Sequence, residues 1–168
     1  MCAYPILLVH GIDDSGARFS RMKAALVGRG LGPVRAMDIV PSDASISIEG
    51  MASQVRDAAC ALQRKTCAPR IDLVAFSMGA LVARYFLQRQ GGRSVVRRFI
   101  SIAGPHHGTL IAYLRQNEGS RQMRPGSALL RGLNADVNPW GDVEVFSFWT
   151  PLDLMVIPAT SSRLKGGA

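Results

Sequence analysis

Hydrophobic residues along this chain fall into two patterns, short continuous runs and longer segments with helical spacing. Five runs are predominantly apolar, which is typical of strands that a parallel sheet buries on both faces. We predict strands at 4–9, 34–40, 71–76, 95–103 and 143–149. Three segments between them repeat apolar residues every three or four positions, as one face of a helix does. We predict helices at 18–27, 48–62 and 78–90.

The order of these elements predicts the fold class. Strands that alternate with helices favour an α/β fold, in which a mostly parallel sheet carries helices on both faces. The stretch 104–142 interrupts the alternation, since it is rich in Gly, Pro, Asn and Arg and contains one predicted helix, 127–134. Loops of this length inside a compact domain are commonly functional or mobile.

The length of the chain and its net charge restrict the number of domains and the kinds of partner. The chain fits one domain, 1–168, and 48% of its residues are hydrophobic, enough for a large core. No apolar run approaches the roughly 18 residues of a transmembrane helix. The net charge is +8, but the arginines are scattered and no aromatic residues alternate with a basic stripe, so we expect no nucleic-acid partner. We interpret the charge as a generally basic surface, and contact with anionic lipid is the alternative.

The cysteines do not decide whether the protein works in an oxidising or a reducing compartment of the cell. Three cysteines leave at least one unpaired in a monomer. A local disulfide between Cys60 and Cys67 stays open, because nothing in the sequence fixes their separation. No spacing is typical of a metal site, and we expect no metal and no organic cofactor. The run 4–9 is too short for a signal peptide, so we expect either a cytoplasmic protein or a secreted one whose leader has been removed.

A serine stands at the junction between a predicted strand and a predicted helix. Ser77 follows the strand that ends at Phe76, and Ala75 and Gly79 lie two positions to either side. A tight strand-to-helix turn of this kind exposes a serine hydroxyl above the sheet and needs small residues at those two positions. The pattern predicts a nucleophile. The alternative is that Ser77 is an ordinary helix N-cap.

A second loop offers backbone donors to the same edge of the sheet. The pair His10-Gly11 directly follows the first strand, and a tight turn there aims N–H groups over the carboxyl ends of the strands. An oxyanion hole needs one donor from this loop and one from the residue after the nucleophile. We therefore expect the amides of Ile12 and Met78 to form it. We interpret His10 as a structural residue that orders the turn.

These segments together resemble the α/β-hydrolase fold, and more narrowly the small bacterial triacylglycerol lipases and esterases of the Bacillus type. They are "PILLVHGI" (5–12), "IDLVAFSMGALVARYFL" (71–87) and "ISIAGPHHGT" (100–109). The resemblance covers nearly the whole chain, 4–164. It implies that the histidines of 105–109 are not the catalytic base. One departure is Phe76, since these lipases commonly have histidine directly before the nucleophile.

The acid of a catalytic triad has a good candidate. In this fold the triad runs Ser, then Asp or Glu, then His along the chain. Asp153 follows the last predicted strand and is the expected acid, although it could also be a turn residue after Pro151. Asp142 is the weaker alternative, because it precedes that strand and would lie at the wrong end of the sheet.

The base has no such candidate. The last histidine is His107, so no histidine follows Asp153. We expect the chain to be a fragment that lacks the final strand, the histidine loop and a closing helix. His106 and His107 are the remaining substitutes for the base, since they follow a strand at the correct end of the sheet.

Two classes of function follow from these residues. The first is a serine carboxylic-ester hydrolase that forms an acyl-enzyme on Ser77 and acts on an ester or lipid substrate. The second is a hydrolase-like protein that has lost catalysis and binds a lipid or acyl ligand. Apolar residues of the long stretch would either line an acyl groove or pack that stretch onto the sheet. They are Leu110, Ile111, Met123, Leu129, Leu130 and Trp140.

Overall fold

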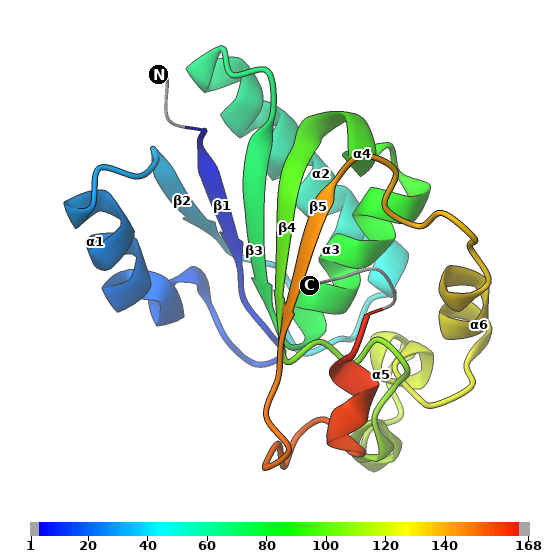
Figure 1. The fold of residues 1–168 in the computed structure, drawn as a ribbon. Coiled ribbons are helices and arrows are strands. Elements are labelled where there is room, and N and C mark those ends of the chain that lie inside the picture. Colours follow the sequence, from blue (N-terminus) through cyan, green and yellow to red (C-terminus); the bar gives the residue numbers. More distant parts are fainter. Residues whose placement is uncertain (1–3, 165–168) are drawn as a thin grey trace.

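The computed structural model describes residues 4–164, and its centre is a sheet of five parallel strands (Figure 1). The strands are β1 Ile6–Val9, β2 Val34–Met37, β3 Ile71–Phe76, β4 Val96–Ile102 and β5 Glu144–Phe148. Their order across the sheet is β2-β1-β3-β4-β5. The chain thus moves outward from β1 to β2, returns to β3 and continues in the other direction. This reversal creates a switch point at the carboxyl ends of β1 and β3, where open α/β sheets bind ligands.

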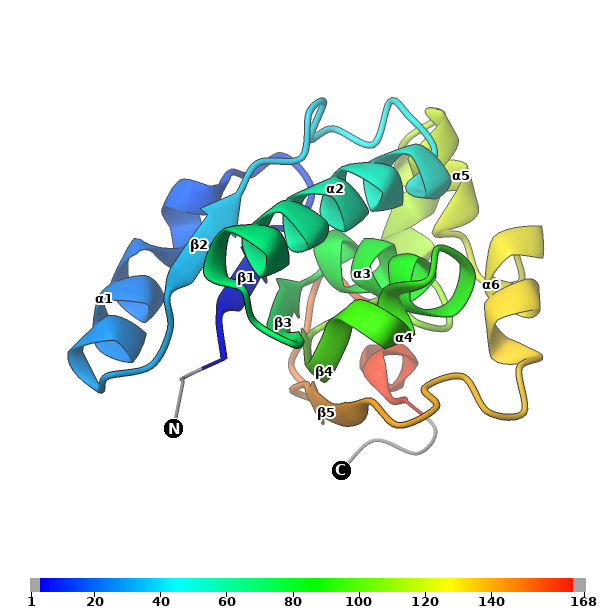
Figure 2. The same ribbon diagram turned by 90° about the horizontal axis from the view of Figure 1, so that it is seen from above.

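Helices lie on both faces of the sheet (Figure 2). Helices α2 and α3 cover one face, and α1 with the short 3-10 helix η1 covers the β1–β2 part of the other. The bounds are η1 Gly16–Phe19, α1 Ser20–Gly28, α2 Ile48–Thr66, α3 Met78–Arg89, α4 Gly92–Val95, η2 Leu110–Leu114, α5 Glu118–Gln122, α6 Ala128–Asn134 and η3 Ala159–Ser162. The predicted fold class, a parallel sheet between helices, is confirmed.

Most predicted elements are present, with shifted ends. Strand β2 ends three residues before the predicted end because the chain leaves the sheet there, and the amide of Ile39 donates instead to the His10 side chain. Helix α2 is four residues longer than predicted and ends at Cys67, whose backbone is left-handed (φ +50°). Cys60 and Cys67 are both free, so the local disulfide that the sequence left open is absent. The ends of the predicted domain, 1–3 and 165–168, lie outside the described residues.

The long stretch 104–142 holds more structure than the sequence predicted. The expected helix is present as α6, whose cap is the Ser127 hydroxyl accepting from the amide of Leu130. Two further short helices, η2 and α5, precede it. The prediction of a single helix was therefore wrong. Both extra helices are only five residues long, too short to show a helical period in the sequence.

The described helices leave part of one sheet face uncovered. Beyond β3 on the α1 side, no helix among residues 4–164 covers the sheet (Figure 2). Ile100 and Phe146 are partly exposed there, and the Phe148 side chain is 59% exposed. Within the same residues, no helix is long and apolar enough to cross a bilayer.

Candidate active site

Ser77 occupies a strained turn between β3 and α3. Its backbone lies at φ +53° and ψ −127°, a region that residues other than glycine rarely adopt. The turn is fixed by the amide of Ser77, which donates to the carbonyl of Ile102 at 2.8 Å. The Ser77 side chain makes no capping hydrogen bond to α3. Ser77 thus occupies the N-cap position of α3, as the alternative predicted, but its hydroxyl does not cap the helix and is available to another group.

The small residues around Ser77 are required by close packing against the loop after β1. A Cβ on Gly79 would lie 2.1 Å from the carbonyl oxygen of His10, and one on Gly11 would lie 3.0 Å from the Cβ of Ser77. Both distances are shorter than ordinary van der Waals contact. Ala75 is fully buried, so the alanine that replaces the usual glycine of the motif fits this turn. The two loops therefore touch at the switch point.

His10 has the structural role expected of it. The ring is fully buried, its Nε2 accepts from the amide of Ile39 at 2.9 Å, and its Nδ1 lies 2.8 Å from the carbonyl of Gly11. Because Nε2 accepts, Nδ1 carries the proton that is donated to the carbonyl of Gly11. Both ring nitrogens are used within the turn, so His10 is not free to take a proton from Ser77.

Two backbone amides beside Ser77 are unpaired among the residues that the structure describes. Within residues 4–164, neither the amide of Ile12 nor that of Met78 donates a hydrogen bond to another group. Amides left unpaired near the surface are available to a ligand. These are the two amides that the sequence predicted for an oxyanion hole.

Ser77 lies between two hollows at the carboxyl edge of the sheet. We call the first, about 520 Å³, the apolar hollow, and the second, about 630 Å³, the aromatic hollow. Ile12, Ser77, Met155 and Val156 line both. The apolar hollow is otherwise lined by Asp13, Met78, Pro105, Thr109, Ile111, Ala112, Leu114, Arg115, Ser120 and Met123. The aromatic hollow is otherwise lined by Asp14, Arg18, Phe76, Ile102, Ala103, Phe148, Trp149, Thr150, Leu152, Asp153 and Leu154.

Asp153 shares the aromatic hollow with Ser77. One carboxylate oxygen, Oδ1, accepts from the amides of Met155 and Val156 at 2.8 and 2.9 Å. The other, Oδ2, accepts no hydrogen bond from residues 4–164. Asp153 is therefore a turn residue, as one alternative predicted, and one of its oxygens is still available to a further donor.

Asp142 lies far from this edge. Its carboxylate pairs with Arg70 at 2.7 Å. Arg70 directly precedes β3, and Asp142 comes shortly before β5, so the pair is at the amino ends of the strands. Ser77 is at the carboxyl ends. Because the length of the strands separates the two residues, Asp142 is excluded as a partner of Ser77.

His106 is buried in the loop after β4. Its Nε2 lies 2.7 Å from the hydroxyl of Ser101, and its Nδ1 has no partner within the described residues. Burial, with smaller contributions from the charges of Arg84 and His107, holds the pKa of His106 well below its usual value. A neutral imidazole could act as a base, but His106 does not line either hollow beside Ser77.

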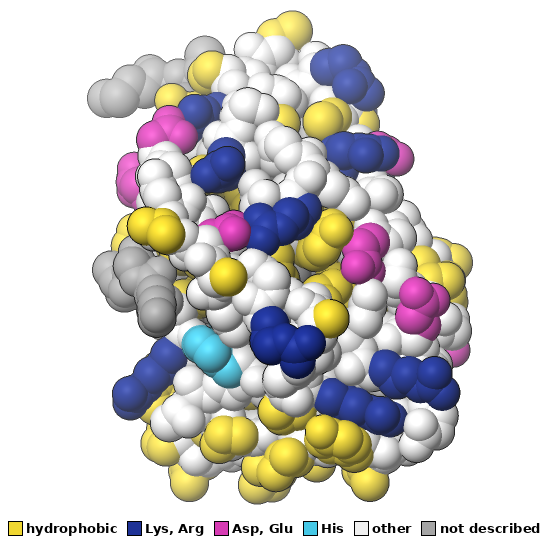
Figure 3. Space-filling model, turned by 90° about the vertical axis from the view of Figure 1, so that its right-hand side faces the viewer, with side chains coloured by type: hydrophobic (Ala, Val, Ile, Leu, Met, Phe, Trp, Pro, Cys, Tyr) yellow, Lys and Arg dark blue, Asp and Glu magenta, His cyan; other side chains and the backbone are white. Residues whose placement is uncertain are grey.

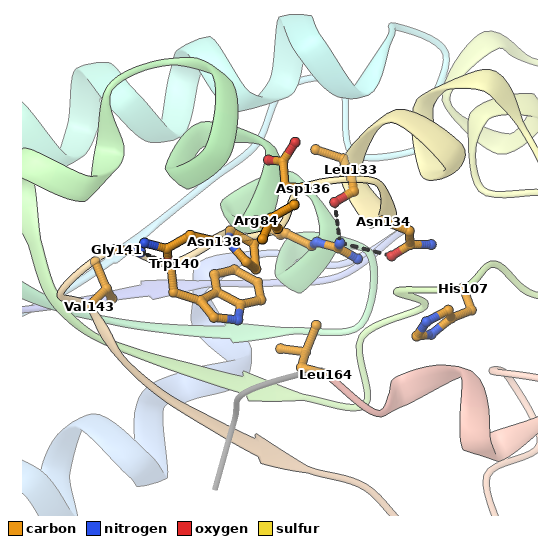
Figure 4. Close-up of a pocket in the computed structure, with 12 residues that line it drawn as sticks. Arg84, His107, Leu133, Asn134, Asp136, Asn138, Trp140, Gly141, Val143 and Leu164 are labelled. Carbon is orange, nitrogen blue, oxygen red and sulfur yellow. Dashed lines mark hydrogen bonds between the residues drawn. The ribbon is translucent and has the colours of Figure 1, made fainter.

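His107 faces a third hollow of about 510 Å³ (Figure 4). Its Nδ1 donates to the carbonyl of Ser161 at 3.2 Å. Trp140 and Leu164 lie in the same hollow, which does not include Ser77. Neither substitute base is therefore positioned beside the serine.

Arg84 is a buried residue that the sequence reasoning did not single out. It comes from α3 and donates to the carbonyls of His106 and Leu133 at 3.1 and 2.9 Å, and to Asn134 Oδ1 at 2.9 Å (Figure 4). Burial lowers the pKa of Arg84 to about 10. The guanidinium ties the helix behind Ser77 to the loop after β4 and to α6. An arginine on the inner face of an apolar helix was the signal that could have revealed it.

The apolar residues predicted for a groove divide between two roles. Ile111 and Met123 line the apolar hollow. Leu130 and Trp140 belong to the core instead. Within residues 4–164, no group of three or more His, Cys, Asp and Glu side chains is arranged to hold a metal ion.

Comparison of the sequence with known proteins finds a matching family and a similar lipase. The sequence pattern of the palmitoyl protein thioesterase family matches residues 5–133. A triacylglycerol lipase from Pseudomonas fragi is 31% identical over 114 residues, which are 65% of this chain and 37% of the lipase. The chain thus spans a little over a third of the length of that relative.

Two of the solved structures that share the fold are lipases by name. Aspergillus fumigatus lipase B has a TM-score of 0.78 at 17% identity. The match covers 98% of this chain and 40% of that one. The propeptide form of Bacillus licheniformis lipase BlEst2 has a TM-score of 0.72 at 17% identity, covering 86% of this chain and 35% of that one. At these identities the likeness shows the fold.

Proposed function

Because the chain belongs to the palmitoyl protein thioesterase family of lipase-like α/β-hydrolases, we propose that it is a serine carboxylic-ester hydrolase of the lipase and esterase type. The observation that carries this proposal is the geometry at Ser77. Its hydroxyl stands on a strained turn, does not cap α3, and lies beside two amides without partners. A binding protein has no need to maintain such a turn.

The chemistry proceeds through an acyl-enzyme. The oxygen of Ser77 attacks the ester carbonyl, and the amides of Ile12 and Met78 bind the oxyanion that forms. The alcohol leaves with a proton, and water then attacks the acyl-enzyme and releases the acid. Asp153 holds and stabilises the imidazole that moves these protons. Neither His10 nor His106 nor His107 lines a hollow with Ser77, which argues against each of them as that imidazole.

The two hollows suggest where each half of the substrate lies. The floor of the apolar hollow is formed by side chains that are at most 5% exposed and carry no charge: Met78, Ala112, Met123 and Val156. This hollow suits the acyl chain, because burial of methylene groups is favourable by about 0.8 kcal/mol each. The aromatic hollow contains Asp14, Arg18 and Asp153 and suits the leaving group.

The mouth of the site is apolar and exposed, which favours contact with a lipid surface. Two segments form the rim: η2 on one side, and the chain from β5 to η3 on the other. Their exposed members are Leu110, Tyr113, Leu114, Phe148, Leu152, Leu154 and Met155. Figure 3 shows hydrophobic side chains gathered along the edge of the molecule where the strands end. We propose that this edge faces the lipid that supplies the substrate.

The test uses the full-length protein with a fluorophosphonate probe and p-nitrophenyl esters of short and medium chain length. We expect Ser77→Ala to remove both labelling and hydrolysis. Ser94→Ala is the matched control, because Ser94 is an exposed serine at the opposite end of the sheet, bonded to the carbonyl of Gly91, and it should change neither. Labelling that persists in Ser77→Ala would show that Ser77 is not the nucleophile. A wild-type protein that binds fatty acid but neither reacts nor turns over would favour the binding-protein alternative.

A further inference from the structure

The residue after Ile12 has an unusual backbone. Asp13 lies at φ +52°, in the left-handed region that costs free energy for any residue with a side chain. Its conformation sets the direction in which the chain continues beyond Ile12. Something must therefore hold Asp13 in place if that amide is to keep its orientation.

Two contacts hold Asp13. Its amide donates to the carbonyl of Ser42 at 2.9 Å. Its carboxylate receives both terminal nitrogens of Arg115, with Nη1 3.1 Å from Oδ1 and Nη2 in a still closer contact with Oδ2. A bidentate arginine–carboxylate pair fixes the orientation of both partners as well as their distance.

Arg115 is itself anchored to the rest of the site. Its carbonyl accepts from Arg124 Nη2 at 2.9 Å. Next to it, Asn117 Nδ2 donates to the carbonyl of Asp43 at 2.7 Å, and the amide of Gly119 donates to the carbonyl of Ala44 at 2.9 Å. The segment after η2 is thus bonded to the loop after β2, and Arg115 extends from this joined base to Asp13. Both members of the pair line the apolar hollow.

We propose that Arg115 is a positioning residue that keeps the amide of Ile12 directed at the substrate oxyanion through the carboxylate and backbone of Asp13. This inference rests on the function proposed above. Arg115 does not touch the reacting atoms, so its loss affects how well the site binds developing charge rather than how well it binds the neutral ester. The effect therefore falls on kcat and leaves KM nearly unchanged.

The first experiment measures ester hydrolysis by the full-length protein carrying Arg115→Gln. Removing an oxyanion donor outright costs about 10²–10³ in kcat, and a misdirected donor should cost less, about tenfold. Arg98→Gln is the matched control, because the Arg98–Glu144 pair has side-chain exposures of 43% and 51%, close to the 42% and 48% of Arg115 and Asp13. It lies at the amino end of the sheet and should leave kcat unchanged.

Salt and a tetrahedral inhibitor separate positioning from a general effect on folding. Because the pair is partly exposed, about 0.5 M salt should weaken it and lower the kcat of the wild type but not that of Arg115→Gln. A trifluoromethyl ketone, which forms an oxyanion on Ser77, should bind the variant about as much more weakly as kcat/KM falls. A fatty alcohol of the same chain length, which carries no charge, should bind both equally. Arg115→Lys, which keeps the charge, should recover part of the loss.

The outcomes are distinct. An active wild type with unchanged kcat in Arg115→Gln would overturn the role of Arg115 and leave the proposed function standing. Equal losses of affinity for the ketone and the fatty alcohol would also overturn it, because they would indicate a damaged hollow. A wild type that reacts with neither ester nor fluorophosphonate would overturn the proposed function itself.

Discussion

At the scale of single residues, the turn at Ser77 depends on Gly79 having no side chain. Gly79→Ala would place a Cβ 2.1 Å from the carbonyl oxygen of His10, so the loop carrying Ile12 must move away from Ser77. We expect a loss of about 2–3 kcal/mol in unfolding free energy, comparable to overpacking in a core, together with loss of ester hydrolysis. Denaturant unfolding measures the first and p-nitrophenyl ester turnover the second.

Gly132→Ala is the control for that substitution. Gly132 lies inside α6, and a Cβ there meets nothing within 4 Å. Alanine in a helix interior should stabilise the protein by about 0.5–1 kcal/mol and leave turnover unchanged. If Gly79→Ala behaves like Gly132→Ala, the contact between the two loops is not what fixes the turn.

At the scale of elements, β5 has an unpaired edge. It is the last strand in the order of the described sheet. On the sheet face that no helix covers, β5 carries the partly exposed Phe146 and Phe148, which is 59% exposed. Unpaired edges with apolar side chains pair with other chains. We therefore predict that the 168-residue polypeptide self-associates, as measured by sedimentation velocity. We also predict that it is nearly inactive in ester turnover, because none of its three histidines lines a hollow with Ser77.

Phe148→Lys should reduce this association, because lysine on an edge strand opposes pairing. Val137→Lys is the control, since Val137 is fully exposed on a loop away from the sheet. A polypeptide of 1–168 that stays monomeric at high concentration and turns over ester would show that neither the unpaired edge nor the distance of its histidines from the hollows beside Ser77 matters as argued. His106→Ala and His107→Ala would then be the decisive variants.

At the scale of the whole molecule, the exposed apolar rim and the net charge of +8 act together. We predict binding to vesicles of phosphatidylcholine and phosphatidylglycerol that weakens as salt is raised, because attraction between a basic surface and anionic lipid is screened. Changing both Leu152 and Leu154 to Asp should weaken binding at least tenfold, since burying a leucine contributes about 1.5–3 kcal/mol. Sedimentation of the vesicles measures the bound fraction.

Val27→Asp is the control for this rim. Val27 is 54% exposed on α1 and does not line either hollow beside Ser77. It should leave vesicle binding unchanged. Equal binding by the double aspartate variant and the wild type would mean that the rim does not face the lipid.

The sequence by itself determined the fold class, the position of Ser77 and the identity of the small residues around it. These depend on local information: continuous apolar runs specify buried parallel strands, and a serine between strand and helix with Ala75 and Gly79 beside it specifies the turn. It also placed all three histidines of these 168 residues before Asp153, because that is a matter of chain order.

Only the tertiary structure decided which distant residues meet. Asp13 and Arg115 are 102 positions apart, and Arg84 reaches Asn134 across 50, so no local pattern reveals either contact. Chain order alone had placed Asp142 at the far end of the sheet, but its partner there, Arg70, became known only from the structure. Local preference sets strands, helices and turns, whereas side-chain partners are chosen by the packing of the whole chain, and the spacing of residues in sequence carries no record of that choice.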